Sequence, residues 1–198
     1  MLSSIHPLGE RAKGNRYGVT LAAYMLGSLA GGLVLGAALG LAGSVLRELI
    51  DPAFAAMTFG AVCMVAFVAD RGRWLSRLPS WHRQVNEDWL AEFRGWVYGS
   101  GFGFQLGLGV VTIIPSAIFY AVMAAGLLVG SVQGAVVIGG AFGLVRGLVL
   151  ITGRRIVDTQ SLLAYHRSFQ RRARLADTAT STALLVGAGT LLLSTVMA

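Results

Sequence analysis

Two groups of hydroxyl side chains lie at helical spacing inside apolar stretches of the sequence. Within each group the hydroxyls are four residues apart, and the groups are Thr20, Tyr24 and Ser28, and Thr112, Ser116 and Tyr120. Residues four apart share one face of a helix, so each group predicts a polar stripe. An amide, Gln105, precedes the second stripe and is costly to leave unpaired in an apolar surrounding.

These stripes have two interpretations. In membrane helices a hydroxyl commonly bonds a neighbouring helix, contributing about 1 kcal/mol or less, so the stripes could hold helices together. They could instead line a substrate pathway. The candidate substrate-binding set is then Thr20, Tyr24, Ser28, Gln105, Thr112, Pro115, Ser116 and Tyr120. Both interpretations stay open on the sequence alone.

The composition predicts a membrane protein. Of the 198 residues, 55% are hydrophobic and only 13% are charged, against roughly 25% charged in soluble domains. A membrane crossing needs about 20 apolar residues. Five apolar segments meet or approach that length, namely residues 17–45, 52–68, 95–128, 129–151 and 178–198. We therefore expect an all-α polytopic membrane protein with about five transmembrane helices, forming one integral membrane domain over residues 1–198.

The charged residues gather in the stretches between these segments. Basic, amphipathic linkers cover residues 70–94 and 154–177, and the net charge of +7 is placed as membrane loops would place it, not as in a nucleic-acid-binding protein. The positive-inside rule puts the N-terminus and both linkers on the cytoplasmic side of a bacterial inner (plasma) membrane. Val85, Trp89 and Phe93 are four residues apart, which predicts an amphipathic helix over residues 85–93. Tryptophans in and beside the linker place this helix at headgroup level.

The pattern of elements also suggests two related halves, residues 10–93 and 94–177, followed by a last transmembrane helix at 178–198. The first segment of each half, 17–45 or 95–128, is too long for one perpendicular span and is interrupted by glycines or by Pro115. Broken spans or re-entrant hairpins would both fit. Interrupted segments at corresponding positions of two halves point to a binding site near the midplane of the membrane.

Glycines repeat at four-residue spacing in several segments, as in Gly99, Gly103 and Gly107. Small residues at this spacing let membrane helices approach closely, which predicts packing faces. Cys63, the single cysteine, is expected to be a small packing residue because it lies inside an apolar segment.

Little in the sequence favours enzyme chemistry. No nucleophile–base pair stands at membrane depth, and the three histidines have no metal-ligand spacing, so we expect no enzyme, metal site or cofactor. Every carboxylate lies in a linker or near a segment boundary. Cation-coupled carriers usually need an embedded acidic residue, so any cargo is expected to be neutral or anionic.

The layout resembles the bacterial superfamily that joins LysE-type exporters, the DsbD/CcdA thiol-electron carriers and small sulfite exporters. The residues that carry the resemblance are Gly101-Phe-Gly-Phe-Gln-Leu-Gly107 and Pro115, at the place where such proteins break a helix. The resemblance implies two interrupted helices around a central site. CcdA-type carriers need a cysteine in each half, and the corresponding segments have none, which argues against electron relay.

Two functions remain. The first is a small-solute or anion permease or exporter with a midplane site between two broken helices. The alternative is a non-catalytic membrane scaffold or biogenesis accessory that acts through a protein partner. The expected partners are the lipid bilayer and either a second copy of the chain, forming a homo-oligomer, or another membrane protein, with no nucleic acid.

Overall fold

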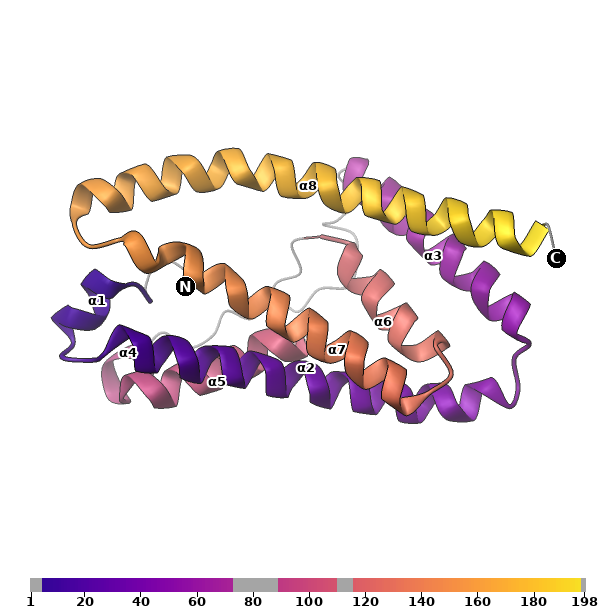
Figure 1. Cartoon of the computed structure of the whole chain (residues 1–198), viewed down its shortest axis with the longest axis horizontal. Coiled ribbons are helices and arrows are strands. Elements are labelled where there is room, and N and C mark those ends of the chain that lie inside the picture. Colours follow the sequence, from indigo (N-terminus) through magenta and orange to yellow (C-terminus); the bar gives the residue numbers. More distant parts are fainter. Residues whose placement is uncertain (1–4, 73–88, 110–115, 197–198) are drawn as a thin grey trace. The chain divides into compact units, whose positions relative to one another are not determined.

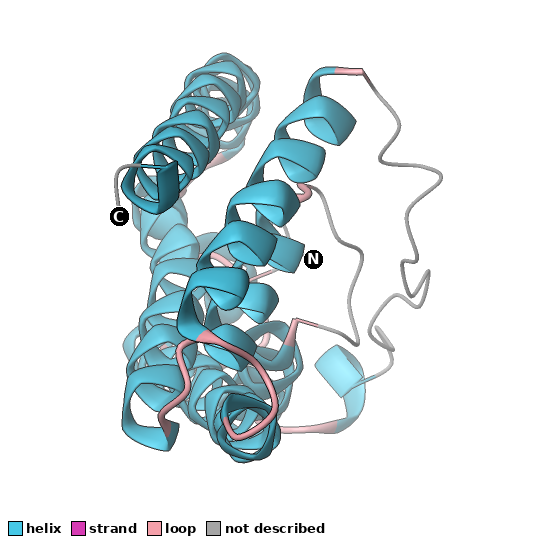
Figure 2. Cartoon of the chain, turned by 90° about the vertical axis from the view of Figure 1, so that its right-hand side faces the viewer, coloured by secondary structure: helices cyan, strands magenta, loops and turns pink. Residues whose placement is uncertain are grey.

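A computed structural model describes residues 5–72, 89–109 and 116–196. The described residues form helices joined by loops and contain no strand (Figure 2). In chain order the helices are α1 (Pro7–Ala12), α2 (Tyr17–Arg47), α3 (Pro52–Arg71), α4 (Trp89–Glu92), α5 (Gly95–Leu108), α6 (Ile118–Leu128), α7 (Val132–Leu148), the 3-10 helix η2 (Val149–Arg155) and α8 (Thr159–Val196) (Figure 1).

Three helical stretches in the described part of the chain are long and apolar enough to cross a membrane. They are Tyr17–Arg47, Pro52–Arg71 and Val132–Arg155. The predicted all-α class is therefore confirmed for the described residues, and three of their helices are candidate membrane spans. The predicted number of about five crossings is not confirmed by these three helices.

The predicted interruption of segment 17–45 is wrong, because α2 is one continuous helix of 31 residues. It contains no proline, so every residue keeps its backbone N–H donor. Each glycine costs about 1 kcal/mol in helix propensity. Close packing offsets that cost, because glycines of α2 lie against the backbones of α5 and α7.

In segment 95–128 the structure describes two helices. Helix α5 ends at Leu108, where Gly109 takes a positive φ of 71°, and α6 begins at Ile118. A positive φ favours glycine, so Gly109 suits the end of α5. Pro115, on which the predicted break was centred, lies outside the described residues.

The second basic linker and the last transmembrane segment are not separate elements. Helix α8 runs without a break over 38 residues from Thr159 to Val196, where a linker ending at residue 177 was expected. Charge does not stop a helix, and neither glycine nor proline occurs between Thr159 and Val186. Of the expected interfacial helix at 85–93, the structure describes α4, whose Trp89 stacks on Phe102 with 5.9 Å between ring centroids.

The chain divides into two compact units. Unit 1 comprises residues 1–33, 82–113 and 140–173, and unit 2 comprises residues 34–81, 114–139 and 174–198. The core of unit 1 is built on aromatic and aliphatic side chains, Ile5, Tyr24, Tyr98, Phe102 and Leu150. The core of unit 2 is built mainly on small ones, Cys63, Ala66, Ala69, Ala117, Ala121, Leu184 and Ala188. Cys63 is thus a packing residue, as predicted.

The glycine repeats pack helices backbone to backbone, as their spacing predicted. In unit 1, a Cβ atom added at Gly103 would lie 2.0 Å from the carbonyl oxygen of Tyr24, and one at Gly143 would lie 2.2 Å from that of Ser28. In unit 2, a Cβ at Gly36 would lie 2.4 Å from the carbonyl oxygen of Ala135. The three helices α2, α5 and α7 therefore tolerate no side chain at these glycines.

Candidate functional site

The most polar buried cluster of unit 1 centres on Glu10 of α1. Its carboxylate is fully buried, with 0% of the residue exposed. The Thr20 hydroxyl of α2 donates to Glu10 Oε2 at 2.7 Å, and the Tyr98 hydroxyl of α5 donates a short hydrogen bond to Glu10 Oε1. One carboxylate therefore ties three helices together.

Asn15, Lys13 and Gly95 make further contacts to this cluster. The Asn15 amide donates to the Tyr98 hydroxyl at 3.3 Å and accepts from the Gly95 backbone N–H at 3.3 Å. The ammonium of Lys13 lies 5.5 Å from the centre of the Tyr98 ring, within the range of a cation–π contact. A Cβ at Gly95 would lie 2.3 Å from the Thr20 hydroxyl, so glycine is needed where α5 begins.

The local sequence explains why Glu10 is held here. Pro7 occupies the first turn of α1, and the His6 side chain accepts from the Gly9 N–H to cap the helix. The Leu8 N–H donates to the Ile156 carbonyl at 3.2 Å, and the Tyr17 hydroxyl donates to the Leu150 carbonyl at 3.0 Å. These bonds anchor the N-terminal segment to the start of η2 and to the residue that follows it.

The first predicted stripe lies in unit 1 and is buried. Thr20 is 1% exposed, Tyr24 5% and Ser28 0%. The Ser28 hydroxyl donates to the Gly143 carbonyl of α7 at 2.7 Å, and Tyr24 belongs to the core of the unit. Gln105 is half-buried on α5. Thr20 and Ser28 thus make contacts between helices, and whether any of the four binds a substrate stays a prediction.

The second predicted stripe falls in unit 2 where it is described. The Ser116 hydroxyl donates to Asp70 Oδ2 at 2.8 Å, and the half-buried Tyr120 packs edge-on against Phe119 beside the unit 2 core. Thr112 and Pro115 lie outside the described residues. Ser116 and Tyr120 therefore belong to a different unit from the first stripe.

A second carboxylate, Asp70, acts at the start of α6. Besides the Ser116 hydroxyl, it accepts the backbone N–H of Ala117 at 2.8 Å. A carboxylate at a helix N-terminus satisfies unpaired N–H groups and interacts favourably with the helix dipole. Asp70, at the end of α3, thereby links α3 to α6.

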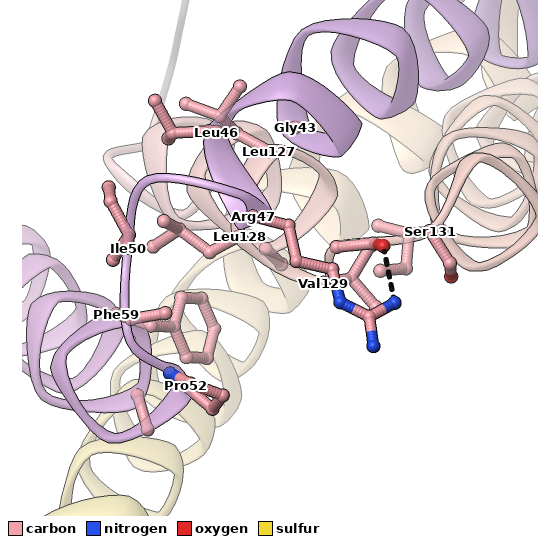
Figure 3. A pocket seen from close by; sticks show the side chains of 15 residues that line it. Gly43, Leu46, Arg47, Ile50, Pro52, Phe59, Leu127, Leu128, Val129 and Ser131 are labelled. Carbon is pink, nitrogen blue, oxygen red and sulfur yellow. Dashed lines mark hydrogen bonds between the residues drawn. The ribbon is translucent and has the colours of Figure 1, made fainter.

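A cavity of about 600 Å³ lies within unit 2, where α2 turns into α3 and α6 turns into α7. Its walls are mostly apolar, and Arg47 supplies its cationic side chain (Figure 3). Nη1 of Arg47 donates to the Gly130 carbonyl at 3.2 Å, while Asp51 accepts the Ala53 N–H at 2.8 Å and caps α3.

These sites offer hydrogen bonding and charge but no evident catalytic group. Within the described residues, no three His, Cys, Asp or Glu side chains are grouped so that they could hold a metal ion. Sequence reasoning missed Glu10 because it placed the residue in a polar N-terminal stretch. The one local signal was that the apolar residues Ile5, Pro7 and Leu8 precede Glu10.

Comparison with known proteins identifies a family. The chain is 33% identical over 192 residues to the methylamine utilization protein MauF of Paracoccus versutus, an alignment that covers 92% of this chain and 68% of that protein. The chain belongs to the MauF family. It is also 30% identical to MauF of Methylobacillus flagellatus, covering 89% of this chain and 63% of that protein. With MauF of Paracoccus denitrificans it shares 32% identity, covering 87% and 58%.

Membership of the MauF family corrects the resemblance drawn from the sequence. The LysE/DsbD/CcdA superfamily is a different family, and the low-specificity motif around Gly101 and Pro115 misled the comparison. The chain spans about three fifths to two thirds of the length of the MauF proteins it matches. No family model matches the chain, and no solved structure matches it.

Proposed function

We propose that this chain is a membrane accessory protein of methylamine utilization that acts through a protein partner. The observation that carries the proposal is the similarity to MauF proteins along nearly the whole chain, with 33% identity to the Paracoccus versutus protein. The sequence left this function open as the alternative to a permease. The similar proteins give the permease no support. The partner would be an enzyme of methylamine conversion whose assembly the chain assists.

The contacts of unit 1 favour a structural role for the first stripe. Thr20 is bonded to Glu10, and Ser28 is bonded to the Gly143 carbonyl, so both hydroxyls are used between helices. A water-filled pathway would leave such groups accessible to solvent. The burial of both residues to 1% or less supports a packed helix bundle instead.

The proposed topology keeps the N-terminus and the basic linkers cytoplasmic. It is supported by the bonds of Leu8 and Tyr17 to residues in and directly after η2, which place the N-terminal segment beside Arg154 and Arg155. The Arg47–Gly130 bond likewise joins the two short connections that this topology puts on the opposite side.

Deletion of the gene in the organism that encodes the chain tests the function. The deletion strain should fail to grow when methylamine is the growth substrate and should grow normally on a substrate that is not an amine. A plasmid carrying the intact gene should restore growth. Normal growth of the deletion strain on methylamine would overturn the proposal.

Cysteine labelling tests the structural interpretation of the stripe. In a Cys63→Ser background, single cysteines at Thr20 and Ser28 should resist a membrane-impermeant thiol reagent in intact cells. A cysteine at Leu49, which is 78% exposed in the connection after α2, is the accessible control. Labelling of both buried positions at the rate of the control would favour an aqueous pathway.

A further inference from the structure

The cavity of unit 2 combines an apolar interior with one cationic group. The apolar walls come from the end of α2, the start of α3 and the end of α6, with Leu46, Ile50, Phe59 and Leu128 among them. Figure 3 shows these side chains around the space and the Arg47 guanidinium on the side of Ser131. A volume of about 600 Å³ lies in the usual range for small-molecule sites, about 300–1,000 Å³.

The exposed Arg47 side chain is oriented by Gly130. Its aliphatic chain lies over Gly130, where an added Cβ would stand 2.9 Å from the Arg47 Cδ. Gly130 also has a positive φ of 67°, a backbone conformation that favours glycine. The Gly130 carbonyl accepts from Nη1 of Arg47, and a guanidinium carries five N–H donors. Donors therefore remain for an anion.

The partner of Arg47 is a neutral carbonyl, so this bond leaves its positive charge unneutralised. The Asp51 carboxylate caps α3, where its Oδ1 accepts the backbone N–H groups of Ala53 and Phe54. Ser131 accepts the Gly134 N–H at 3.2 Å, so its own hydroxyl proton can be donated to an anion. Glu48, the remaining acidic residue of the connection, is exposed.

The place of the cavity decides the kind of occupant. It lies where two helices long enough to cross the membrane, α2 and α3, adjoin. Apolar side chains beside it are exposed, with Val45 64% exposed and Phe54 60% exposed, as expected of surfaces that face lipid. The cation thus stands near the end of the apolar spans, at the depth where phospholipid headgroups lie.

We propose that this cavity binds an anionic phospholipid of the surrounding bilayer. The headgroup phosphate pairs with Arg47 and receives the Ser131 hydroxyl, while an acyl chain enters the apolar space lined by Ile50 and Phe59. Charge-assisted hydrogen bonds from arginine to phosphate are among the stronger contacts a protein makes. The site is independent of the proposed role in methylamine utilization.

Native mass spectrometry of the purified full chain tests this site. Phosphatidylglycerol and phosphatidylcholine with identical acyl chains would be titrated separately against the wild type and two variants. Arg47→Gln should weaken phosphatidylglycerol binding about tenfold. Arg155→Gln, which removes the same charge from an exposed position in unit 1, should leave it unchanged. Equal binding of the two lipids, or equal losses in the two variants, would overturn the proposal.

Two further variants separate lipid binding from folding. Ala56→Phe fills the cavity without changing any charge and should also weaken phosphatidylglycerol binding. Arg47→Lys keeps the charge and should therefore retain more phosphatidylglycerol binding than Arg47→Gln. Thermal unfolding of each variant reports its folding. Wild-type lipid binding by a folded Ala56→Phe variant would contradict the site.

A photoreactive residue distinguishes lipid from a protein occupant. Benzoylphenylalanine placed at Ala55, which lines the cavity, would be irradiated in native membranes. An adduct with the mass of an anionic phospholipid supports the proposal. An adduct with a polypeptide would overturn it and assign the cavity to a protein partner.

Discussion

Helices α5 and α6 both come from the apolar segment 95–128, yet the two units hold them differently. In unit 1, α5 lies backbone to backbone on α2 and begins beside Glu10, a fully buried carboxylate that accepts two side-chain hydroxyls. In unit 2, α6 packs on α3 through small side chains and begins at Asp70, a half-buried carboxylate that caps it. The carboxylate of Glu10 thus joins helices as a buried hydrogen-bond acceptor, whereas the carboxylate of Asp70 caps a helix.

The two units thus differ in how their polar side chains are used and in whether they contain a cavity. Unit 1 uses its polar side chains between helices, as Ser28 and Thr20 do. Unit 2 retains a cavity of about 600 Å³ with an arginine at its wall. We expect substitutions in unit 1 to act chiefly on stability, and those around the unit 2 cavity to act chiefly on binding.

The largest expected effect comes from glycines at backbone contacts. Gly103→Ala should cost about 3 kcal/mol or prevent folding, because the new Cβ would meet the Tyr24 carbonyl at 2.0 Å. Gly126→Ala in α6 meets the Leu39 side chain at 3.1 Å, which can move, and should cost less. Thermal unfolding in detergent measures both. Gly18→Ala, with nothing within 4 Å, is the control and should not destabilise the protein.

Removal of the buried carboxylate should have the next largest effect. Glu10→Ala leaves the Thr20 and Tyr98 hydroxyls buried without this acceptor, at about 1–3 kcal/mol for each unsatisfied group. Glu10→Gln keeps an acceptor of the same shape and should cost about 1 kcal/mol. Chemical unfolding would measure both variants. Equal stability of Glu10→Ala and the wild type would break the contrast between the units.

The cap of α6 should matter less. Asp70→Ala removes the acceptor of the Ala117 N–H and should cost about 1 kcal/mol, the usual loss for a helix cap. Asp70→Asn keeps a capping oxygen and should lie within a few tenths of the wild type. A loss at Asp70→Ala as large as that at Glu10→Ala, in the same unfolding assay, would show that both carboxylates are structural ties of one kind.

The smallest effect is expected at the start of α8. Asp158 accepts the Ser161 N–H at 2.6 Å, and this bond, followed by that from the Ser161 hydroxyl, holds the pKa of Asp158 below its usual value. A lowered folded-state pKa contributes stability that is present above the unfolded value, about 3.9, and is lost as the pH falls through the folded value. The melting temperatures of wild type and Asp158→Ala should therefore converge below pH 4. An Asp158→Asn variant should lack this pH-dependent contribution.

The sequence predicted those features that depend on one segment at a time. Length and apolarity located α2 and α3 within a few residues, and glycine spacing predicted their close packing. The predicted interruption of 17–45 was wrong because its glycines were interpreted as helix breaks. They instead contact the backbones of α5 and α7. Glu10 was missed because its burial depends on Tyr98, which lies far away along the chain.

The cavity was equally beyond sequence reasoning. The partner of Arg47 is the Gly130 carbonyl of another connection, which lies 83 residues away along the chain. The positive φ at Gly130 is visible only in the folded chain. The family assignment depended on comparison with whole sequences, because no short motif of the chain carries it.

The most direct test of the central claim is the rate of methylamine consumption in broken-cell extracts of the deletion strain. Cell breakage removes the membrane barrier, so a missing permease would no longer limit the reaction. An accessory role predicts that the extract stays inactive per milligram of protein, and that expression of the intact chain during growth restores activity. Wild-type activity in extracts of a strain that cannot use methylamine as whole cells would contradict the account and indicate transport.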